Sequence, residues 1–182
     1  MINEILETSD AHVAAHIGPQ RNLSAVAKPQ PPPEKYVRFR LSKQAFCLRA
    51  ETVRGVMGAQ SLIPALNSGF DMVGFIFSQN KALAVLDLRP KLNLHPGEVS
   101  AKGTIILVSL PSDPQIKAGI LVEQLEATVE FGPTAVINEP HPQIPLQFLR
   151  GKVQLEDETV WVLDLDFLLN PVHLRRLETL SY

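Results

Sequence analysis

The chain has 182 residues, of which 45% are hydrophobic and 20% charged, a composition that excludes both a disordered protein and a membrane-embedded one. Its formal net charge of −2 argues against a nucleic-acid-binding protein with a basic face. No apolar run approaches the roughly 18 residues that would span a bilayer. The N-terminus lacks the basic start of a signal peptide, and the single cysteine, Cys47, excludes a disulfide framework. We therefore expect a cytoplasmic protein without a membrane-inserted segment.

Residues 1–35 are predicted to form an extension outside the folded body. The stretch Lys28–Pro33 is rich in proline, which lacks a backbone donor and clashes with a helix, so this stretch should be extended. Before it, apolar residues at helical spacing suggest a short amphipathic helix over about residues 2–16, which would be marginal in water without a docking partner. Two interpretations stay open: a mobile leader, or a helix that binds a partner.

From residue 36 onward the sequence takes the period of two that is typical of strands. Val37, Phe39 and Leu41 alternate with arginines, which predicts a strand with one face in water. Turn signals rich in glycine, asparagine and proline separate further segments of this kind. The predicted strands are Val37–Leu41, Ala45–Leu48, Gly74–Phe77, Leu83–Leu86, Thr104–Ser109, Lys117–Leu121, Phe148–Gln154 and Thr159–Leu163. A short helix is predicted only at the end of the chain, in residues 171–182, so the body is mainly β.

The most informative feature is an internal duplication. The segment Val85–Leu88, with the sequence V-L-D-L, recurs 77 residues later as Val162–Leu165. A glycine lies 13 residues before the aspartate of each copy, Gly74 in the first and Gly151 in the second. Each copy therefore has the same order of glycine, strand, turn and strand.

The duplication sets the expected organisation of the folded body, residues 36–170. Two units of about 60–70 residues, roughly 37–94 and 104–169, would each have a marginal core alone. Each unit is expected to bury its apolar edge against the other. The result would be two β-barrels packed side by side around a shared core.

Aspartates at the ends of the V-L-D-L strands are the obvious candidates for chemistry. Asp87 and Asp164 occupy the same position of the two repeats, and Asp166 follows closely. Paired carboxylates can hold a metal or act as acid and base, and an enzyme using Asp164 and Asp166 is one alternative. Because Asp87 and Asp164 are equivalent, we expect instead that each caps the helical turn after its strand by accepting backbone N–H bonds.

Other residues that could carry chemistry do not form a recognisable site. His12 and His16 have the spacing of half a metal site, but no third ligand follows. Cys47 lies in an apolar strand, and Trp161 lies between two valines, so both are expected in the core. The sequence contains no nucleophile elbow and no phosphate-binding glycine loop. We predict no catalytic residue, no metal and no cofactor, and a protein that works by binding other proteins.

Four stretches of the body match a known pattern in order and spacing. They are Tyr36–Leu41 followed by Phe46–Leu48; Val53–Val56; Gly74–Arg89; and, in the second half, Gly119–Glu123 with Val162–Leu169. Together they resemble the CheW family, adaptors that couple chemoreceptors to the histidine kinase CheA. The resemblance implies two tandem five-stranded SH3-like barrels packed side by side, with no cofactor and no catalysis.

The resemblance also implies partners. In the family, one barrel docks on the related regulatory domain of the kinase, and a groove between the barrels takes the cytoplasmic tip of the receptor. This chain would then be an adaptor recruited to membrane receptor arrays, coupling chemoreceptors to a CheA-like histidine kinase. An alternative is a scaffold of a pilus or surface-motility array in which the N-terminal extension binds an additional partner.

This sequence departs from the family pattern at a few positions. Gly55 stands where the family has glutamate in V-x-E-V, and Gln79 and Asn80 stand for the arginine and glycine of N-L-R-G. A glutamate and an arginine on neighbouring strands could form a charged pair that sets the register of a partner. Their joint absence suggests a changed partner surface or a scaffold without full coupling. Asn80 falls where we expect positive φ, which asparagine tolerates.

The candidate partner-binding residues lie just past a strand edge and at a hairpin tip. They are Arg54, Gly55, Met57, Gln79, Asn80 and Lys81. Met57 has two interpretations that stay open: an apolar anchor for a partner, because methionine adapts to irregular surfaces, or a buried core residue.

Overall fold

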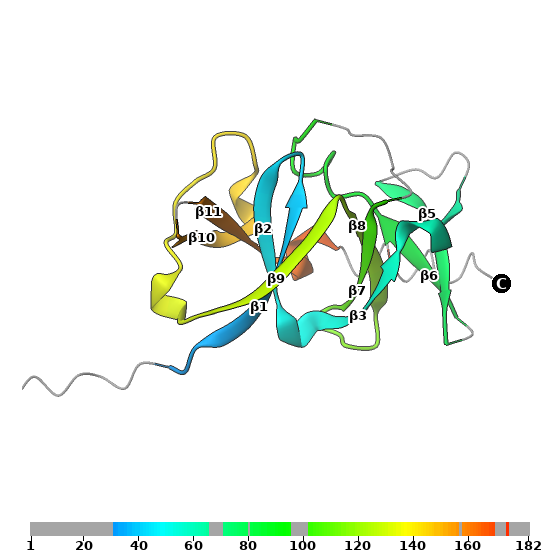
Figure 1. Cartoon of the computed structure of the whole chain (residues 1–182), viewed down its shortest axis with the longest axis horizontal. Coiled ribbons are helices and arrows are strands. Elements are labelled where there is room, and N and C mark those ends of the chain that lie inside the picture. The colour runs from blue at the N-terminus through cyan, green and yellow to red at the C-terminus, as the bar shows by residue number, and fades with distance from the viewer. Residues whose placement is uncertain are drawn as a thin grey trace, which may run out of the picture.

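The structure is a computed structural model, and it describes residues 31–65, 71–79, 81–95, 102–156, 158–169 and Leu174. Within this part the chain is mainly β, with two sheets side by side (Figure 1). The predicted extension lies outside the described residues up to residue 30. The predicted C-terminal helix, 171–182, also lies outside them except for Leu174, which is buried in the core.

Two sheets account for the strands of the described chain. The first, which we call barrel A, has the order β10-β11-β2-β1-β9 and contains β1 (Glu34–Leu41), β2 (Gln44–Arg49), β9 (Gln124–Phe131), β10 (Leu149–Leu155) and β11 (Glu158–Leu163). The second, barrel B, has the order β3-β7-β8-β6-β5-β4 and contains β3 (Val53–Gly58), β4 (Ile63–Pro64), β5 (Met72–Ser78), β6 (Lys81–Leu86), β7 (Thr104–Ser109) and β8 (Lys117–Val122).

Short helical segments connect these strands. They are η1 (Ala50–Thr52), η2 (Ala59–Ser61), η3 (Pro133–Ala135), η4 (Leu146–Phe148) and α1 (Leu165–Leu168). Every predicted strand is present, with ends that differ by up to three residues, whereas β3, β4 and β9 were not predicted as strands. The prediction of a mainly β fold is therefore confirmed.

The two repeats exchange their first hairpins. β10 and β11 repeat β5 and β6 at the same offset, from Met72 to Leu149, and each pair has a register shift next to its glycine, Gly74 or Gly151. In barrel A, however, the β1–β2 hairpin of the first repeat pairs with strands of the second. In barrel B, the β7–β8 hairpin of the second repeat pairs with strands of the first.

This exchange corrects one prediction. The barrels are not the successive segments 37–94 and 104–169, because β1 pairs with β9 and β2 runs parallel to β11. The equivalent contacts in barrel B are β3 with β7 and β6 parallel to β8. Sequence periodicity tells which face of a strand is buried, but not which repeat supplies its neighbour.

The shared core exists because the central strands are apolar on both faces. In β2, Ala45 and Cys47 face the interior of barrel A, whereas Phe46 and Leu48 face the space between the barrels. Strands β6, β8 and β11 divide their side chains in the same way. The largest apolar cluster therefore lies between the barrels and draws on both, as the sequence predicted.

The arginines of β1 do not face open water, contrary to the prediction. Arg38 and Arg40 are half-buried, and each pairs with Glu126 of β9 and Glu158 of β11. The hydrogen bond from Arg40 lowers the pKa of the Glu158 carboxyl, and the positive charges of both arginines add to that effect. This network lets barrel A hold four charged groups at β1 without leaving one unpaired.

The two equivalent glycines give a test of the fold. A Cβ on Gly151 would lie 2.5 Å from the carbonyl oxygen of Ile137, at a φ of +143°, and a Cβ on Gly74 would overlap the carbonyl oxygen of Ile63. We expect Gly151→Ala to lower the free energy of unfolding by about 3 kcal/mol, and Gly74→Ala by about 2 kcal/mol, in urea denaturation.

Gly55→Ala is the matched control, because a Cβ there meets only the Leu107 side chain at 3.6 Å. It should leave the free energy of unfolding nearly unchanged. Equal losses in all three variants would contradict the close approach of backbone at the two repeat glycines.

Candidate partner-binding surface

β3 forms one edge of barrel B and is hydrogen-bonded to β7. Arg54 is exposed, and its Nε donates a hydrogen bond to Ser109 Oγ at 2.8 Å. Met57 is half-buried and packs against the interior cluster of barrel B, so the structure places it on the core side. The apolar side chain that β3 does expose is Val56, at 48%. Burial alternates along β3, so that Arg54 and Val56 are exposed, whereas Gly55 and Met57 are half-buried.

The predicted hairpin tip joins β5 to β6. Ser78 pairs with Lys81, and Gln79 and Lys81 are both exposed. Gln79 has a φ of 51°, whereas Asn80, where positive φ was expected, lies outside the described residues. Two-residue hairpin turns favour positive φ at their central positions, which explains the conformation of Gln79.

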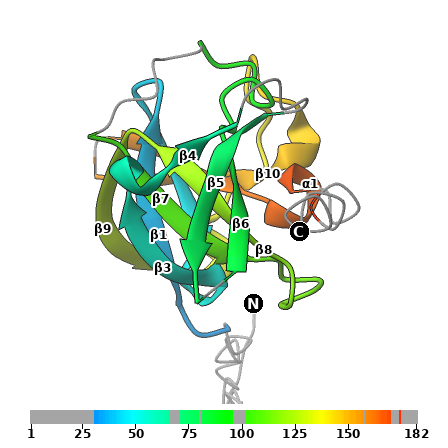
Figure 2. The ribbon, with the colours of Figure 1, turned by 90° about the vertical axis from the view of Figure 1, so that its right-hand side faces the viewer.

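The start of β3 and the β5–β6 tip lie at the same end of barrel B, as Figure 2 shows. They are not on neighbouring strands, however, because β7, β8 and β6 separate β3 from β5 in the hydrogen-bonded order. The prediction that positions 55 and 79 lie on neighbouring strands is therefore wrong. Arg54, Gly55, Gln79 and Lys81 lie toward one end of the barrel without forming a contiguous pair of strands, whereas Met57 lies toward the other end of β3.

An apolar surface at the opposite edge of the sheet was not predicted from the sequence. Ile63 of β4 is 51% exposed, and Phe77 of β5 is 63% exposed. Ile63 lies opposite Phe75, and Phe77 follows Phe75 by two residues on the same face of β5. We call Ile63, Phe75 and Phe77 the Ile63–Phe77 face. The signal was present as aromatic residues at a spacing of two in a strand that was otherwise correctly predicted.

The equivalent face of barrel A also exposes an isoleucine, Ile137 at 53%, but polar residues replace the two phenylalanines. The Ile63–Phe75 pair of barrel B corresponds to the Ile137–Lys152 bridge of barrel A. Lys152 therefore stands in the place of Phe75, and Gln154 in the place of Phe77. Lys152 forms an ion pair of 2.7 Å with Glu139, and Gln154 is exposed. Two structurally equivalent edges have thus acquired different chemistry.

A buried charged group lies at the junction of the barrels. The Arg89 guanidinium, 3% exposed, donates hydrogen bonds of 2.8–3.1 Å to both carboxylate oxygens of Asp87 and one of 3.1 Å to Glu123. These bonds, chiefly those to Asp87, raise the pKa of Arg89. Glu123 also accepts a hydrogen bond from the backbone N–H of Ser42 in the β1–β2 turn. The junction therefore ties barrel B to barrel A through satisfied charges.

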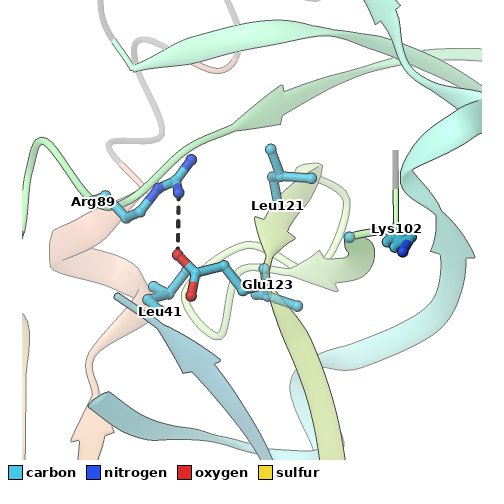
Figure 3. A pocket seen from close by; sticks show the side chains of 7 residues that line it. Leu41, Arg89, Lys102, Leu121 and Glu123 are labelled. Atoms are coloured by element: carbon cyan, nitrogen blue, oxygen red, sulfur yellow. Dashed lines mark hydrogen bonds and ion pairs between the residues drawn. The ribbon is translucent and has the colours of Figure 1, made fainter. Parts of the chain in front are cut away.

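A small pocket of about 70 Å³ opens at this junction (Figure 3). Leu41 from the end of β1 and Leu121 from β8 form its apolar wall, and Arg89 and Glu123 lie at one side. The remaining lining residues are Lys102, Gly103 and Val122. The pocket therefore belongs to both barrels.

The two repeat aspartates have different surroundings. Asp164 is the N-cap residue of α1, where it accepts a hydrogen bond of 3.1 Å from the N–H of Asp166 and pairs with Arg150. Asp87 accepts the backbone N–H of Arg89 at 3.0 Å, but it also binds the buried Arg89 side chain. The Asp166 carboxylate accepts hydrogen bonds from the backbone N–H and the hydroxyl of Ser112. Asp164 and Asp166 therefore do not face one another as an acid–base pair.

Residues suited to metal or thiol chemistry form no site in the described ranges. There, no three side chains of histidine, cysteine, aspartate or glutamate lie close enough to hold a metal ion. His12 and His16 are outside those ranges. Burial raises the pKa of the Cys47 thiol to about 12, which keeps it protonated and unreactive. No helix in the described part has the length and apolarity needed to cross a membrane.

Comparisons with known proteins agree with this geometry. The CheW-like domain family matches residues 35–173 of the chain. The chain belongs to the CheW-like family. A relative from Rhizobium etli, named a probable chemotaxis protein CheW, is 25% identical over 136 residues, which cover 72% of this chain and 84% of the relative.

The fold of a solved CheW-like protein is also similar. The crystal structure of the scaffolding protein TtCheW from Thermoanaerobacter tengcongensis has a TM-score of 0.67 at 22% identity, covering 78% of this chain and 91% of that chain. The predicted fold class, two SH3-like barrels, is thereby confirmed. CheW-like proteins are non-catalytic scaffolds, so this chain is a scaffold and the enzyme alternative is not supported.

Asp87→Asn and Asp164→Asn test whether the repeat aspartates differ as their contacts indicate. Asp87→Asn leaves the buried Arg89 with only Glu123 as a charged partner, and should lower the free energy of unfolding by about 3 kcal/mol in guanidinium denaturation. Asp164→Asn should cost about 0.5 kcal/mol, because asparagine is also a good N-cap and the Arg150 pair is partly exposed. Similar losses in the two variants would show that Arg89 adds nothing to the role of Asp87.

Proposed function

We propose that this CheW-like scaffold is an adaptor that couples chemoreceptors to a CheA-like histidine kinase. Support comes from its family membership, from the relative named as a chemotaxis protein and from the solved relative named as a scaffolding protein. The observation that carries the proposal is the Ile63–Phe77 face: both barrel edges expose an isoleucine, Ile63 or Ile137, but only the edge of barrel B also exposes a phenylalanine, Phe77. In this proposal the protein works in the cytoplasm, recruited to membrane receptor arrays through its partners.

The kinase regulatory domain is the partner that we assign to barrel B. Exposed phenylalanine and isoleucine beside each other at a sheet edge have the character of binding hot spots, which are commonly aromatic residues ringed by polar ones. Lys81 and Gln79 at the β5–β6 tip, both exposed, supply such a polar rim. The equivalent edge of barrel A carries the Lys152–Glu139 ion pair and would lose hydration if it were buried in the same way.

The receptor tip is the partner that we assign to the junction between the barrels. The pocket there has an apolar wall formed by Leu41 and Leu121, with charged groups beside it. Its volume of about 70 Å³ suits the insertion of a single small side chain rather than a whole segment. Because the shared core fixes the two barrels, a partner held at this junction and another held on barrel B would keep a constant relative position.

The six candidate residues of β3 and the β5–β6 tip keep their proposed role as partner-binding residues: Arg54, Gly55, Met57, Gln79, Asn80 and Lys81. Met57 would act from beneath the surface, since it packs against the interior cluster, and Val56 would make the direct contact. The alternative function is a scaffold of a pilus or surface-motility array, with residues 1–35 binding an additional partner. Gly55 and Gln79 favour it, because both lack the charge that the family pattern has there.

Removing the Phe77 side chain tests the kinase assignment. In calorimetry with the CheW-like regulatory domain of the cognate kinase, Phe77→Ser should weaken binding at least roughly tenfold, as expected for loss of a central aromatic anchor. Gln154→Ser, the equivalent exposed position of barrel A, should bind like the wild type. Unchanged binding by Phe77→Ser would remove the Ile63–Phe77 face from the interface.

A double variant, Gly55→Glu with Gln79→Arg, separates the two functions. The backbone at Gly55 tolerates a Cβ, since an added Cβ meets only Leu107 at 3.6 Å. If the wild type binds the kinase domain at micromolar strength, the adaptor proposal stands with a changed surface. Binding by the double variant alone would show that the kinase contact has been lost and would favour the alternative scaffold.

A further inference from the structure

The loop from residue 132 to 148, between β9 and β10, contributes directly to the shared core. Ile144 is 3% exposed and Phe148 is 9% exposed, and both belong to the apolar cluster between the barrels. The same loop carries Ile137 and Leu146, which are 53% and 52% exposed. Its conformation therefore decides both how the core is closed and which apolar residues barrel A presents.

This loop is held by backbone hydrogen bonds between Ile137 and Lys152, by the Asn93 side chain on the Gln143 carbonyl, and by His141. The Nδ1 of His141 accepts hydrogen bonds from the backbone N–H groups of Gln143 at 3.0 Å and Ile144 at 3.1 Å. Its Nε2 lies 3.1 Å from Gln44 Oε1 on β2. The ring also meets Trp161 of β11 edge-on, with centroids 4.7 Å apart. The imidazole thus joins the loop to two strands and sets the backbone directly before the buried Ile144.

These contacts require the neutral imidazole. Two N–H donors point at Nδ1, so this nitrogen has no proton, and the proton on Nε2 is donated to Gln44 Oε1. A protonated ring would carry N–H groups on both nitrogens. Its Nδ1–H would then face the N–H groups of Gln143 and Ile144, and both hydrogen bonds would be lost.

No ionised group in the described surroundings offsets this loss. The charged residues on the elements packed against His141 are Lys43, Arg49, Glu139, Lys152 and Glu158. Lys152 pairs with Glu139, Arg49 with Glu34 and Glu51, and Glu158 with the arginines of β1. Burial is accordingly what lowers the pKa of His141 from its ordinary 6.5. The closed loop binds the proton less readily than an open loop, so acidification below about 6.5 favours opening.

We propose that His141 is a pH-sensitive lock on the 132–148 loop, which holds the loop closed when neutral and releases it when protonated. Release would withdraw Ile144 from the shared core and expose one side of Trp161. It would also free the segment that presents Leu146, whereas Ile137 stays held by its backbone hydrogen bonds to Lys152, and so change the surface of barrel A without unfolding either sheet. This inference does not depend on the identity of the partners proposed above.

Hydrogen exchange of the full chain, read by mass spectrometry over residues 138–147, tests the lock. Protection is expressed relative to the unstructured rate at each pH. In the wild type it should fall several-fold between pH 7.5 and pH 5. The fall in protection has an upper limit of about tenfold for each pH unit by which the pKa of His141 in the closed loop lies below its pKa in the open loop.

Variants separate the lock from general acid destabilisation. His141→Asn places an oxygen where Nδ1 lies and does not titrate, so its protection should be the same at both pH values. His141→Phe keeps a ring beside Trp161 but has no acceptor, so its protection should be low at both. His95→Gln, at an exposed histidine, should keep the wild-type pH dependence. Equal protection of the wild type at both pH values, or an unchanged fall in His141→Asn, would overturn the proposal.

Discussion

The burial of one apolar core between two barrels that exchange hairpins is the constraint on which the rest of the structure depends. Phe46 and Leu48 of β2 face this core while their neighbours in the strand face the interior of barrel A. A strand that is apolar on both faces is stable only when both faces are covered. Neither repeat can satisfy that condition alone, so the barrels fold together and hold a fixed relative position. A scaffold that joins two partners needs that rigidity.

The shared core also explains the charged groups buried at the junction of the barrels. Arg89 lies where the chain leaves barrel B next to the shared core, and a buried guanidinium is tolerated only with carboxylate partners. Asp87 supplies one within the same turn, and Glu123 supplies the other from the connection to barrel A. In the second repeat, Asp166 stands at the position of Arg89, and Asp164 is left with a cap and a partly exposed ion pair. Identical V-L-D-L segments therefore serve different purposes because the residue two places later differs.

Local features of the fold were predictable from the sequence, whereas pairing between repeats was not. The V-L-D-L strands were found because alternation and turn signals act over a few residues. β3 and β9 were missed because exposed edge strands such as Gln124–Phe131 carry many polar residues and little periodicity. At β3, exposed and half-buried residues alternate from Val53 to Met57, so the exposure of Val56 would have followed from alternation if the segment had been predicted as a strand. The contact of His141 with Gln44 joins segments 97 residues apart, so sequence spacing gave no sign of it.

Divergence of the two repeats explains how a symmetric fold acquires a directional surface. On barrel A, the chain's own loop packs its His141 against Trp161, and the Lys152–Glu139 ion pair lies at the outer edge beside the exposed Ile137. On barrel B, the equivalent edge carries Phe77 in the open. A large aromatic side chain in this position is costly to leave in water, whereas the edge of barrel A leaves Ile137 exposed beside polar residues and so uncovers less apolar surface. Barrel A is therefore partly covered by its own loop, whereas barrel B leaves its aromatic edge uncovered.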